Sequence, residues 1–221
     1  MKVCILLPAY NESKTIGPLV RSLREKQLDV FVVNDGSIDN SGQIAREAGA
    51  NVIDNPQKSG KGFSLRKGFA HIISLDYDGV IVMDSDGQHA VSDVDNFIQL
   101  AEQNPQVMIN GNRMAQAKEM PFVRSMTNRL MSLLISLACR QAIPDTQCGY
   151  RYIGISVLKD LSLTCNSYEI ETEMLMKASK KKFSVLSVPV ETIYRNEKSK
   201  INPVIDTYRF IIYFLKELFS K

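Results

Sequence analysis

Several signals that would assign a chain to a common class are missing from these 221 residues. No apolar run approaches the roughly 20 residues that a membrane span needs, and no basic stretch followed by a long apolar one marks a signal peptide. The charges nearly balance, with 27 Lys and Arg against 24 Asp and Glu, so nothing favours a nucleic acid as partner. These absences predict a cytoplasmic protein that at most rests on the inner face of a membrane.

Signals for particular sites are missing as well. The four cysteines show neither CxxC nor any other metal-ligand spacing, so we expect buried, reduced thiols. The first strand-like run is followed neither by the G-x-G-x-x-G of a dinucleotide-binding oxidoreductase nor by a Gly-rich activating loop. Ser59-Gly60-Lys61-Gly62 lacks the full spacing of a P-loop. It predicts either a glycine-assisted helix start or a loop that attracts anions.

Short apolar runs alternate with helical patterns along the chain. The strand-like runs lie at about 3–8, 30–34, 51–54, 80–84, 107–110 and 184–190. Such alternation is typical of stacked βαβ units and predicts an α/β fold. A chain of this length fits one domain, and the regular alternation ends near residues 110–120.

The most informative motif is Asp84-Ser85-Asp86-Gly87-Gln88, which directly follows an apolar run. Two carboxylates spaced i, i+2 and a side-chain amide two residues later supply oxygen ligands at the tip of a buried strand. Such ligands suit Mg²⁺ or Mn²⁺, which bind a few carboxylates and take further ligands from water and a diphosphate. We therefore expect Asp84, Asp86 and Gln88 to bind a metal ion, with His89 in a supporting role.

Two earlier strand-like runs also end in polar residues, Pro8-Ala9-Tyr10-Asn11-Glu12 and Asn34-Asp35-Gly36-Ser37. Because ligands of open parallel sheets bind outside the carboxyl ends of the strands, all three motifs should converge on one rim. In this order they resemble glycosyltransferase family 2, which has the GT-A fold, over residues 3 to about 200. Within that family the chain is most similar to dolichyl-phosphate mannose and glucose synthases and their bacterial polyprenyl-phosphate relatives.

The resemblance implies a GT-A type, Rossmann-like α/β fold with a mixed, mostly parallel sheet flanked by helices. It implies metal-dependent, inverting transfer of a hexose from a nucleotide-diphosphate sugar, of the UDP-glucose or GDP-mannose type, to a polyprenyl phosphate. The chain is then a single domain, in which 1–112 binds the nucleotide sugar, 113–200 binds the acceptor and 201–221 forms an amphipathic helix. The implied catalytic residues are Asp86, Arg113 and Arg195. The implied nucleotide-sugar ligands are Pro8, Tyr10, Glu12, Asp35, Lys61, Asp84, Ser85 and Lys200.

Arg113, Arg124 and Asn128 are the residues that the resemblance assigns to the acceptor phosphate. A guanidinium can grip a phosphate bidentately, and Arg124 and Asn128 are spaced i, i+4 on one helix face. A phosphate monoester is already anionic at neutral pH, because its second pKa is about 6. No strong general base is then required, which fits a chain with two histidines and no His–carboxylate dyad.

Three other functions stay open. A family 2 enzyme acting on a sugar hydroxyl, as in cell-surface polysaccharide synthesis, would need a base such as Glu171. A sugar nucleotidyltransferase would need the activating loop that this chain lacks. An inactive nucleotide-sugar-binding protein is disfavoured by the intact Asp84-x-Asp86-x-Gln88 motif. We expect Glu169, Glu171 and Glu173 to be solvated acids at a helix start, with one of them available to the sugar or the acceptor.

Two helical segments carry an apolar face. Residues 122–135 either pack on the core or lie on a bilayer, and the family resemblance favours the bilayer. The run from Pro203 to Lys221 has an apolar stripe beside basic residues. It can dock on the domain, form a homodimer or lie on the inner leaflet, and we predict weak, reversible membrane association.

Overall fold

The computed structural model describes residues 1–114, 122–193 and 203–219. Its centre is a seven-stranded sheet in the order β3-β2-β1-β4-β6-β5-β7. Strand β6 runs antiparallel to both of its neighbours, and the remaining pairings are parallel. The strands are β1 Val3–Ala9, β2 Asp29–Asn34, β3 Asn51–Asp54, β4 Gly79–Val82, β5 Met108–Asn112, β6 Arg151–Gly154 and β7 Val185–Pro189. This is the mixed, mostly parallel sheet that the sequence predicted.

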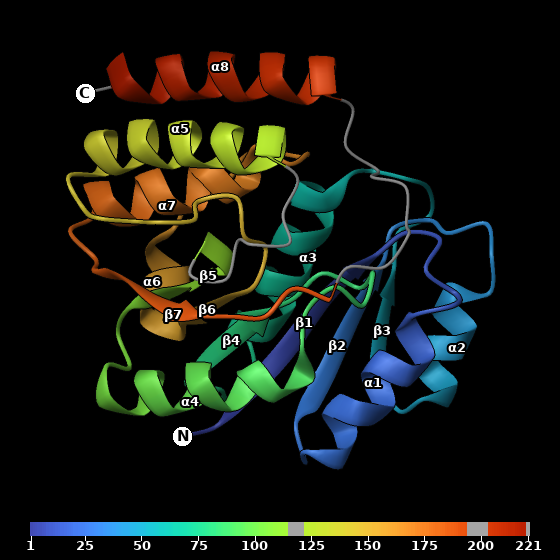
Figure 1. Ribbon diagram of the computed structural model, residues 1–221. Helices are drawn as coiled ribbons and strands as arrows, with labels where there is room; N and C mark the ends of the chain where they lie inside the picture. The colour runs from blue at the N-terminus through green and yellow to red at the C-terminus, as the bar shows by residue number, and fades with distance from the viewer. Residues whose placement is uncertain (115–121, 194–202, 220–221) are drawn as a thin grey trace.

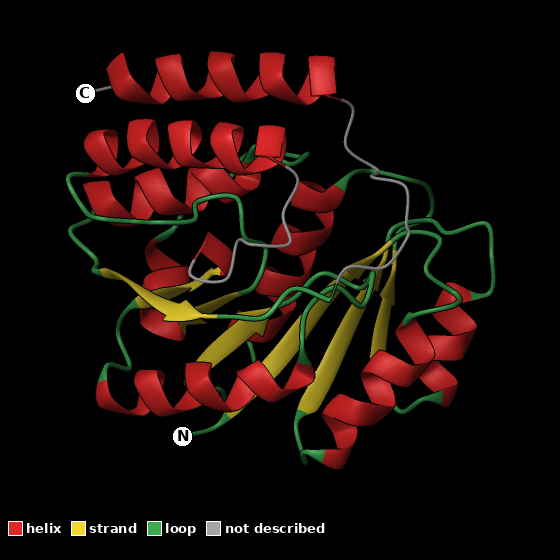
Figure 2. Cartoon of the chain, viewed as in Figure 1, coloured by secondary structure: helices red, strands yellow, loops and turns green. Residues whose placement is uncertain are grey.

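Helices cover both faces of the sheet (Figures 1 and 2). One face carries α1 Ile16–Glu25, α2 Ser41–Glu47 and α4 Val94–Gln103, with the short 3-10 helix η1 Val91–Asp93 before α4. The other face carries α3 Lys61–Ile73, α6 Ile155–Asp160 and α7 Ile170–Lys180. Two long helices, α5 Phe122–Cys139 and α8 Pro203–Phe219, pack on α7 as an outer layer. Across the described parts of the chain, no helix has the length and apolarity to cross a bilayer.

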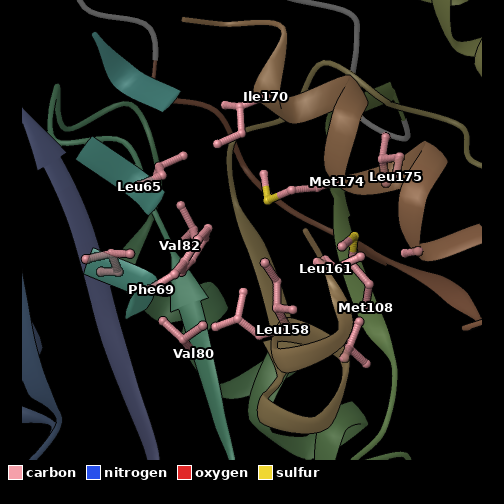
Figure 3. Packing of buried hydrophobic residues seen from close by; sticks show 14 of the residues in the cluster. Leu65, Phe69, Val80, Val82, Met108, Leu158, Leu161, Ile170, Met174 and Leu175 are labelled. Atoms are coloured by element: carbon pink, nitrogen blue, oxygen red, sulfur yellow. The ribbon is translucent and has the colours of Figure 1, made fainter. Parts of the chain in front are cut away.

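The central strands β1 and β4 are apolar along their whole length because both faces of the sheet are covered there. Val80 and Val82 of β4 face Leu65 and Phe69 of α3, in a cluster that extends to α6 and α7 (Figure 3). Ile81 points to the opposite face and joins the cluster formed with α1 and α4. A pleated strand alternates its side chains in this way. Two buried layers therefore fix the strands whose carboxyl ends carry the polar motifs.

All six strand-like runs of the sequence are strands, with small shifts at their ends. The run expected at 80–84 ends at Val82, so Asp84 lies two residues beyond its strand. Strand β6, which runs antiparallel to its neighbours, was not predicted from the sequence. All four cysteines are free, and Cys4, Cys139 and Cys148 are buried as expected.

Candidate active site

The loops that follow β1, β2 and β4 are tied together at one rim of the sheet. The Ser85 hydroxyl donates to the carbonyl of Pro8 at 2.8 Å, and the Thr15 hydroxyl donates to the carbonyl of Ser85 at 2.8 Å. The backbone N–H of Asn11 donates to Oγ of Ser37 at 3.0 Å. The three motifs therefore converge as the parallel topology predicts.

Tyr10 and Glu12, two residues of the loop after β1 that are expected to bind the nucleotide sugar, already have partners within the protein. Nζ of Lys58 lies 4.3 Å from the centroid of the Tyr10 ring, a cation–π contact. The backbone N–H of Glu12 donates to Oγ of Ser41 at 2.7 Å, and its carboxylate accepts from the Thr15 hydroxyl at 3.2 Å. Their roles in base and ribose binding stay predictions.

Asp84 belongs to a chain of ion pairs that the sequence did not reveal. Nζ of Lys61, at the start of α3, lies 2.5 Å from Oδ1 of Asp84 and 2.5 Å from Oε1 of Glu171 on α7. The other oxygen of Glu171 lies 3.4 Å from Nη2 of Arg151 on β6. Nε2 of His89 lies 3.7 Å from Oδ2 of Asp84, and the supporting role of His89 toward a metal ion stays a prediction. These contacts join residues from four separate elements.

The opposite charges in this series of ion pairs stabilise one another. Burial alone would lower the pKa of Lys61, but Asp84 and Glu171 outweigh it and raise that pKa above its usual value. Burial would raise the pKa of Asp84, but Lys61 and His89 outweigh it and lower that pKa. Asp86 differs, because burial first and then the charge of Asp84 raise its pKa. The Asp86 carboxylate accepts from the backbone N–H of Gln88 at 2.9 Å, and this bond with the charges of His89 and Lys61 lowers its pKa less than burial and Asp84 raise it.

Asp35 holds the loop that precedes α3. Its carboxylate accepts from the backbone N–H groups of Ser59 and Gly60, each at 2.9 Å, and from Nδ2 of Asn55 at 2.8 Å. Two N–H groups that a phosphate-binding loop would offer are thus used inside the protein. This favours the helix-start interpretation of Ser59-Gly60-Lys61-Gly62, and the role of Asp35 toward the nucleotide base stays a prediction.

The two glycines flanking Lys61 allow another segment to approach closely. A Cβ on Gly60 would lie 2.3 Å from the carbonyl oxygen of Asn166, and one on Gly62 would lie 2.6 Å from that of Cys165. Real Cβ atoms do not come so close to backbone oxygens. The Gly-Lys-Gly motif therefore seats α3 against residues 165–167 and aims Lys61 between Asp84 and Glu171.

Arg113, at the end of β5, forms a bidentate pair with Asp145. Nε and Nη2 of the guanidinium lie 2.7 and 2.9 Å from the two carboxylate oxygens. Asp145 is fully buried and Arg113 is 8% exposed. The geometry expected for a phosphate is therefore already filled by a carboxylate, and a role of Arg113 toward the acceptor stays a prediction.

The other expected acceptor residues lie on α5 or beyond the described part. Asn128 is buried, and its Nδ2 is among the buried polar atoms without a hydrogen-bond partner. One turn later, Oγ of Ser132 lies 3.2 Å from Oγ1 of Thr146, so this face of α5 meets the 145–147 loop. Arg124 lies on α5, but its side chain, like Arg195 and Lys200, is outside the described residues.

The expectation of solvated acids at the start of α7 is wrong. Glu173 is fully buried and accepts from the N–H groups of Thr164 and Cys165 at 2.8 and 2.9 Å. The Glu171 side chain is only 12% exposed and pairs with Lys61. These carboxylates turn inward because each meets donors from segments distant in sequence, which a helical pattern cannot reveal.

The residue types at Asp84, Asp86 and Gln88 fit a hard divalent cation. Among residues 1–114, 122–193 and 203–219, no group of three or more His, Cys, Asp or Glu side chains is arranged to hold a metal ion. Mg²⁺ and Mn²⁺ sites that take one or two carboxylates and complete their shell with water and phosphates do not need such a group. The raised pKa of Asp86 marks the negative charge that a cation would relieve.

Comparison with known proteins connects this geometry to a family. A family model described as "Glycosyl transferase family 2" matches residues 4–162. The chain belongs to glycosyltransferase family 2. One relative, the UDP-N-acetylglucosamine–dolichyl-phosphate N-acetylglucosaminyltransferase of Methanococcus voltae, is 30% identical over 87% of this chain and 86% of its own length. Another, the dolichyl-phosphate hexose transferase of Haloferax volcanii, is 25% identical over 91% of this chain and 87% of its own.

Solved structures of this glycosyltransferase fold agree with the architecture. Glucosyl-3-phosphoglycerate synthase from Mycobacterium tuberculosis, in complex with phosphoglyceric acid, superimposes with a TM-score of 0.77 at 18% identity, covering 98% of this chain and 80% of that chain. The same enzyme with Mn²⁺ and UDP-glucose superimposes with a TM-score of 0.72 at 21% identity, covering 98% and 78%. At this identity the likeness establishes the GT-A fold alone. The protein is therefore a glycosyltransferase of family 2 with this fold.

Proposed function

We propose that this glycosyltransferase uses Mg²⁺ or Mn²⁺ to move a sugar from a nucleotide-diphosphate donor to a polyprenyl phosphate, with inversion. The observation that carries the acceptor class is the state of Glu171. This carboxylate, the candidate base of the sequence analysis, is ion-paired to Lys61 and Arg151. A carboxylate held by two cations is poorly suited to take a proton from a hydroxyl. A phosphate acceptor needs no such step, because it is already anionic.

On the donor side, Asp84, Asp86 and Gln88 would hold the cation, and its contribution when bound is to stabilise charge developing on the leaving diphosphate. Ser85 fixes the loop to the end of β1 through the Pro8 carbonyl. His89, with 5% exposure, packs behind Asp84. The glucosyl-3-phosphoglycerate synthase of the same fold that was solved with Mn²⁺ and UDP-glucose supports the use of a divalent cation with such a donor.

On the acceptor side, an orphaned donor supports a ligand beside α5. Nδ2 of Asn128 is buried without a partner, and leaving such a donor unpaired costs about 1–3 kcal/mol. A phosphate oxygen would satisfy it. Arg113 and Arg124 would complete the anion site, which holds the nucleophile in line with the donor. The relatives named for dolichyl-phosphate transfer support the same acceptor class.

The relatives leave several sugars open. Their names include N-acetylglucosamine, hexose and, for a Mycolicibacterium smegmatis protein 23% identical over 86% of this chain and 76% of its own length, mannose. The proposed function is therefore tested with three nucleotide sugars as donors: UDP-glucose, UDP-N-acetylglucosamine and GDP-mannose. Protein, Mn²⁺ or Mg²⁺ and each donor are incubated with and without a short polyprenyl phosphate, and release of nucleoside diphosphate is measured.

We expect release that depends on the lipid phosphate and is lost in Asp86→Ala. Lys26→Met, which removes only one partner of the exposed Lys26–Asp95 pair, serves as the control and should keep activity. Release with simple sugars in place of the lipid, abolished by Glu171→Gln, would instead establish a hydroxyl acceptor. No release with any donor would favour an inactive nucleotide-sugar-binding protein.

An exposed apolar surface along α5 and α8 supports a lipid acceptor. Apolar side chains that are at least 40% exposed lie along both helices: Met126, Leu130, Leu133, Leu134, Leu137, Ile205, Tyr208, Ile211, Ile212, Leu215, Leu218 and Phe219. The two acidic side chains of α8 add little negative charge to this surface, because each is only 13% exposed. Asp206 pairs with Arg209, and Glu217 pairs with Lys180. Exposed Arg129 and Lys216 add positive charge. Apolar side chains with cations and no outward acid match an anionic lipid surface.

Cosedimentation with vesicles of phosphatidylglycerol and phosphatidylcholine at low salt tests this surface. The paired change Leu130→Glu with Leu137→Glu should abolish binding, whereas Leu75→Glu, at a 37% exposed site after α3, should not. Point changes are preferable to removing α8, because Phe210, Tyr213 and Phe214 of that helix pack on the core. A stable dimer in solution that Leu130→Glu dissolves, without vesicle binding, would assign the surface to a second copy.

A further inference from the structure

Lys61 lies between two carboxylates at the rim of the sheet. Its ammonium touches Asp84, one of the expected metal ligands, and Glu171, each at 2.5 Å. The side chain is 11% exposed, so the ammonium is held in place rather than in solvent. Gly149 closes the site from the other side, since a Cβ there would lie 2.5 Å from Oδ2 of Asp84 and 3.1 Å from Nζ of Lys61. The contact is thus built by four segments: α3, the loop after β4, α7 and the loop before β6.

We propose that Lys61 is an internal counter-ion that competes with the divalent cation for Asp84, and that Glu171 is the positioning residue that retains it there. A divalent cation arriving alone must displace an ammonium from a buried ion pair. A cation arriving with a nucleoside diphosphate brings an anion that offers the displaced ammonium a new partner. The protein should therefore bind metal and nucleotide synergistically and bind metal weakly on its own. This inference rests on the metal-dependent donor site of the proposed function.

Substitutions of Lys61 and of Glu171 should change the competition between the Lys61 ammonium and a divalent cation for Asp84 in different ways. Removing the ammonium leaves Asp84 and Glu171 without their shared cation, so the site should attract a metal ion more strongly. Neutralising Glu171 leaves Lys61 with Asp84 as its remaining carboxylate partner among the described residues. The ammonium should then compete more strongly with a metal ion for Asp84. The two changes therefore act on metal affinity in opposite directions. A purely structural role would lower stability in both variants and weaken metal binding in both.

Mn²⁺ binding is measured by electron paramagnetic resonance of the free ion, without nucleotide and with UDP or GDP. For the native protein we expect nucleotide to tighten Mn²⁺ binding by about five- to 150-fold, the usual range of coupling between two sites. In Lys61→Met we expect Mn²⁺ alone to bind about tenfold more tightly and most of the coupling to vanish. Lys61→Arg should keep the coupling, because it keeps the charge.

In Glu171→Gln we expect Mn²⁺ alone to bind more weakly than to the native protein. Lys26→Met, which removes an equal charge from the exposed pair with Asp95, should leave Mn²⁺ affinity unchanged. Thermal unfolding of each variant confirms that the fold is retained. Equal or weaker Mn²⁺ binding by folded Lys61→Met would overturn the inference.

This experiment is separate from the test of the proposed function. The metal-only comparison of Lys61→Met with Glu171→Gln needs no donor sugar and no acceptor. A native protein that transfers sugar normally but shows no opposite shifts would refute the counter-ion while leaving the transferase intact. Opposite shifts without any sugar transfer would retain the counter-ion and reject the proposed reaction.

Discussion

The buried pair of Arg113 and Asp145 should be essential for stability, whatever its role toward the acceptor. The carboxylate of Asp145 accepts four hydrogen bonds, three from the N, Nε and Nη2 groups of Arg113 and one from the N–H of Gln147. Asp145→Asn keeps the shape but removes the charge and one acceptor oxygen. The Arg113 guanidinium is then left buried without its counter-ion.

Breaking a buried ion pair from one side costs about 3–5 kcal/mol, because the remaining charge is uncompensated. For a chain of this size each 1 kcal/mol shifts the unfolding temperature by about 2–4 °C, so the expected loss is about 6–20 °C. Calorimetry or fluorescence-monitored thermal unfolding of the native protein and the variant measures it. Substrate is left out, so that stability alone is compared.

The matched control is Asp54→Asn, which breaks the exposed Arg46–Asp54 pair, in which both side chains are 49% exposed. An exposed pair contributes about 0–1 kcal/mol, so this variant should unfold within about 4 °C of the native protein. The double variant Arg113→Met with Asp145→Leu should recover much of the lost stability, since no charge stays buried. If Asp145→Asn unfolds no earlier than Asp54→Asn, the reasoning about this pair is refuted.

Two further predictions concern the rim of the sheet. Burial and then the charge of Asp84 raise the pKa of Asp86 in the folded protein. Protonated Asp86 therefore contributes stability below the ordinary carboxyl pKa of about 3.9. This contribution is lost as pH rises through the pKa that Asp86 has in the folded protein. Asp86→Asn should therefore raise the unfolding temperature at neutral pH and lose this advantage in acid, and an unfolding temperature that is lower at neutral pH would contradict it. Gly149→Ala places a Cβ 2.5 Å from Oδ2 of Asp84, which should lower kcat/KM by about 100-fold through misplacement while costing only about 1–3 kcal/mol of stability. An unchanged kcat/KM would show that Asp84 tolerates this displacement.

The fold was predictable where sequence patterns are local. Apolar runs bounded by helical patterns gave six of the strands, and the polar residues at the ends of β1, β2 and β4 gave the rim. Strand β6 was missed because it contains Arg151, a residue type rare in buried strands. Its guanidinium is satisfied by the carbonyls of Thr146, Cys148 and Glu171, which only the folded chain brings together.

The same limit applies to the site. The motif Asp84-x-Asp86-x-Gln88 could be found because its members are neighbours in sequence. The pairing of Lys61 with Glu171 spans 110 residues and joins the starts of two helices, so neither spacing nor composition reveals it. One signal was available, since the two glycines around Lys61 indicate close backbone approach. What approaches was visible only in three dimensions.

Mass spectrometry of the lipid product tests most directly whether this protein glycosylates a polyprenyl phosphate. The protein is incubated with Mn²⁺, a nucleotide sugar that supports diphosphate release and a short polyprenyl phosphate, and the extracted lipid is analysed for mass and anomeric configuration. We predict a sugar joined through its anomeric carbon to the lipid phosphate, with inverted configuration, and no such product from Asp86→Ala. Unmodified lipid alongside a glycosylated hydroxyl acceptor, or a retained configuration, would contradict it.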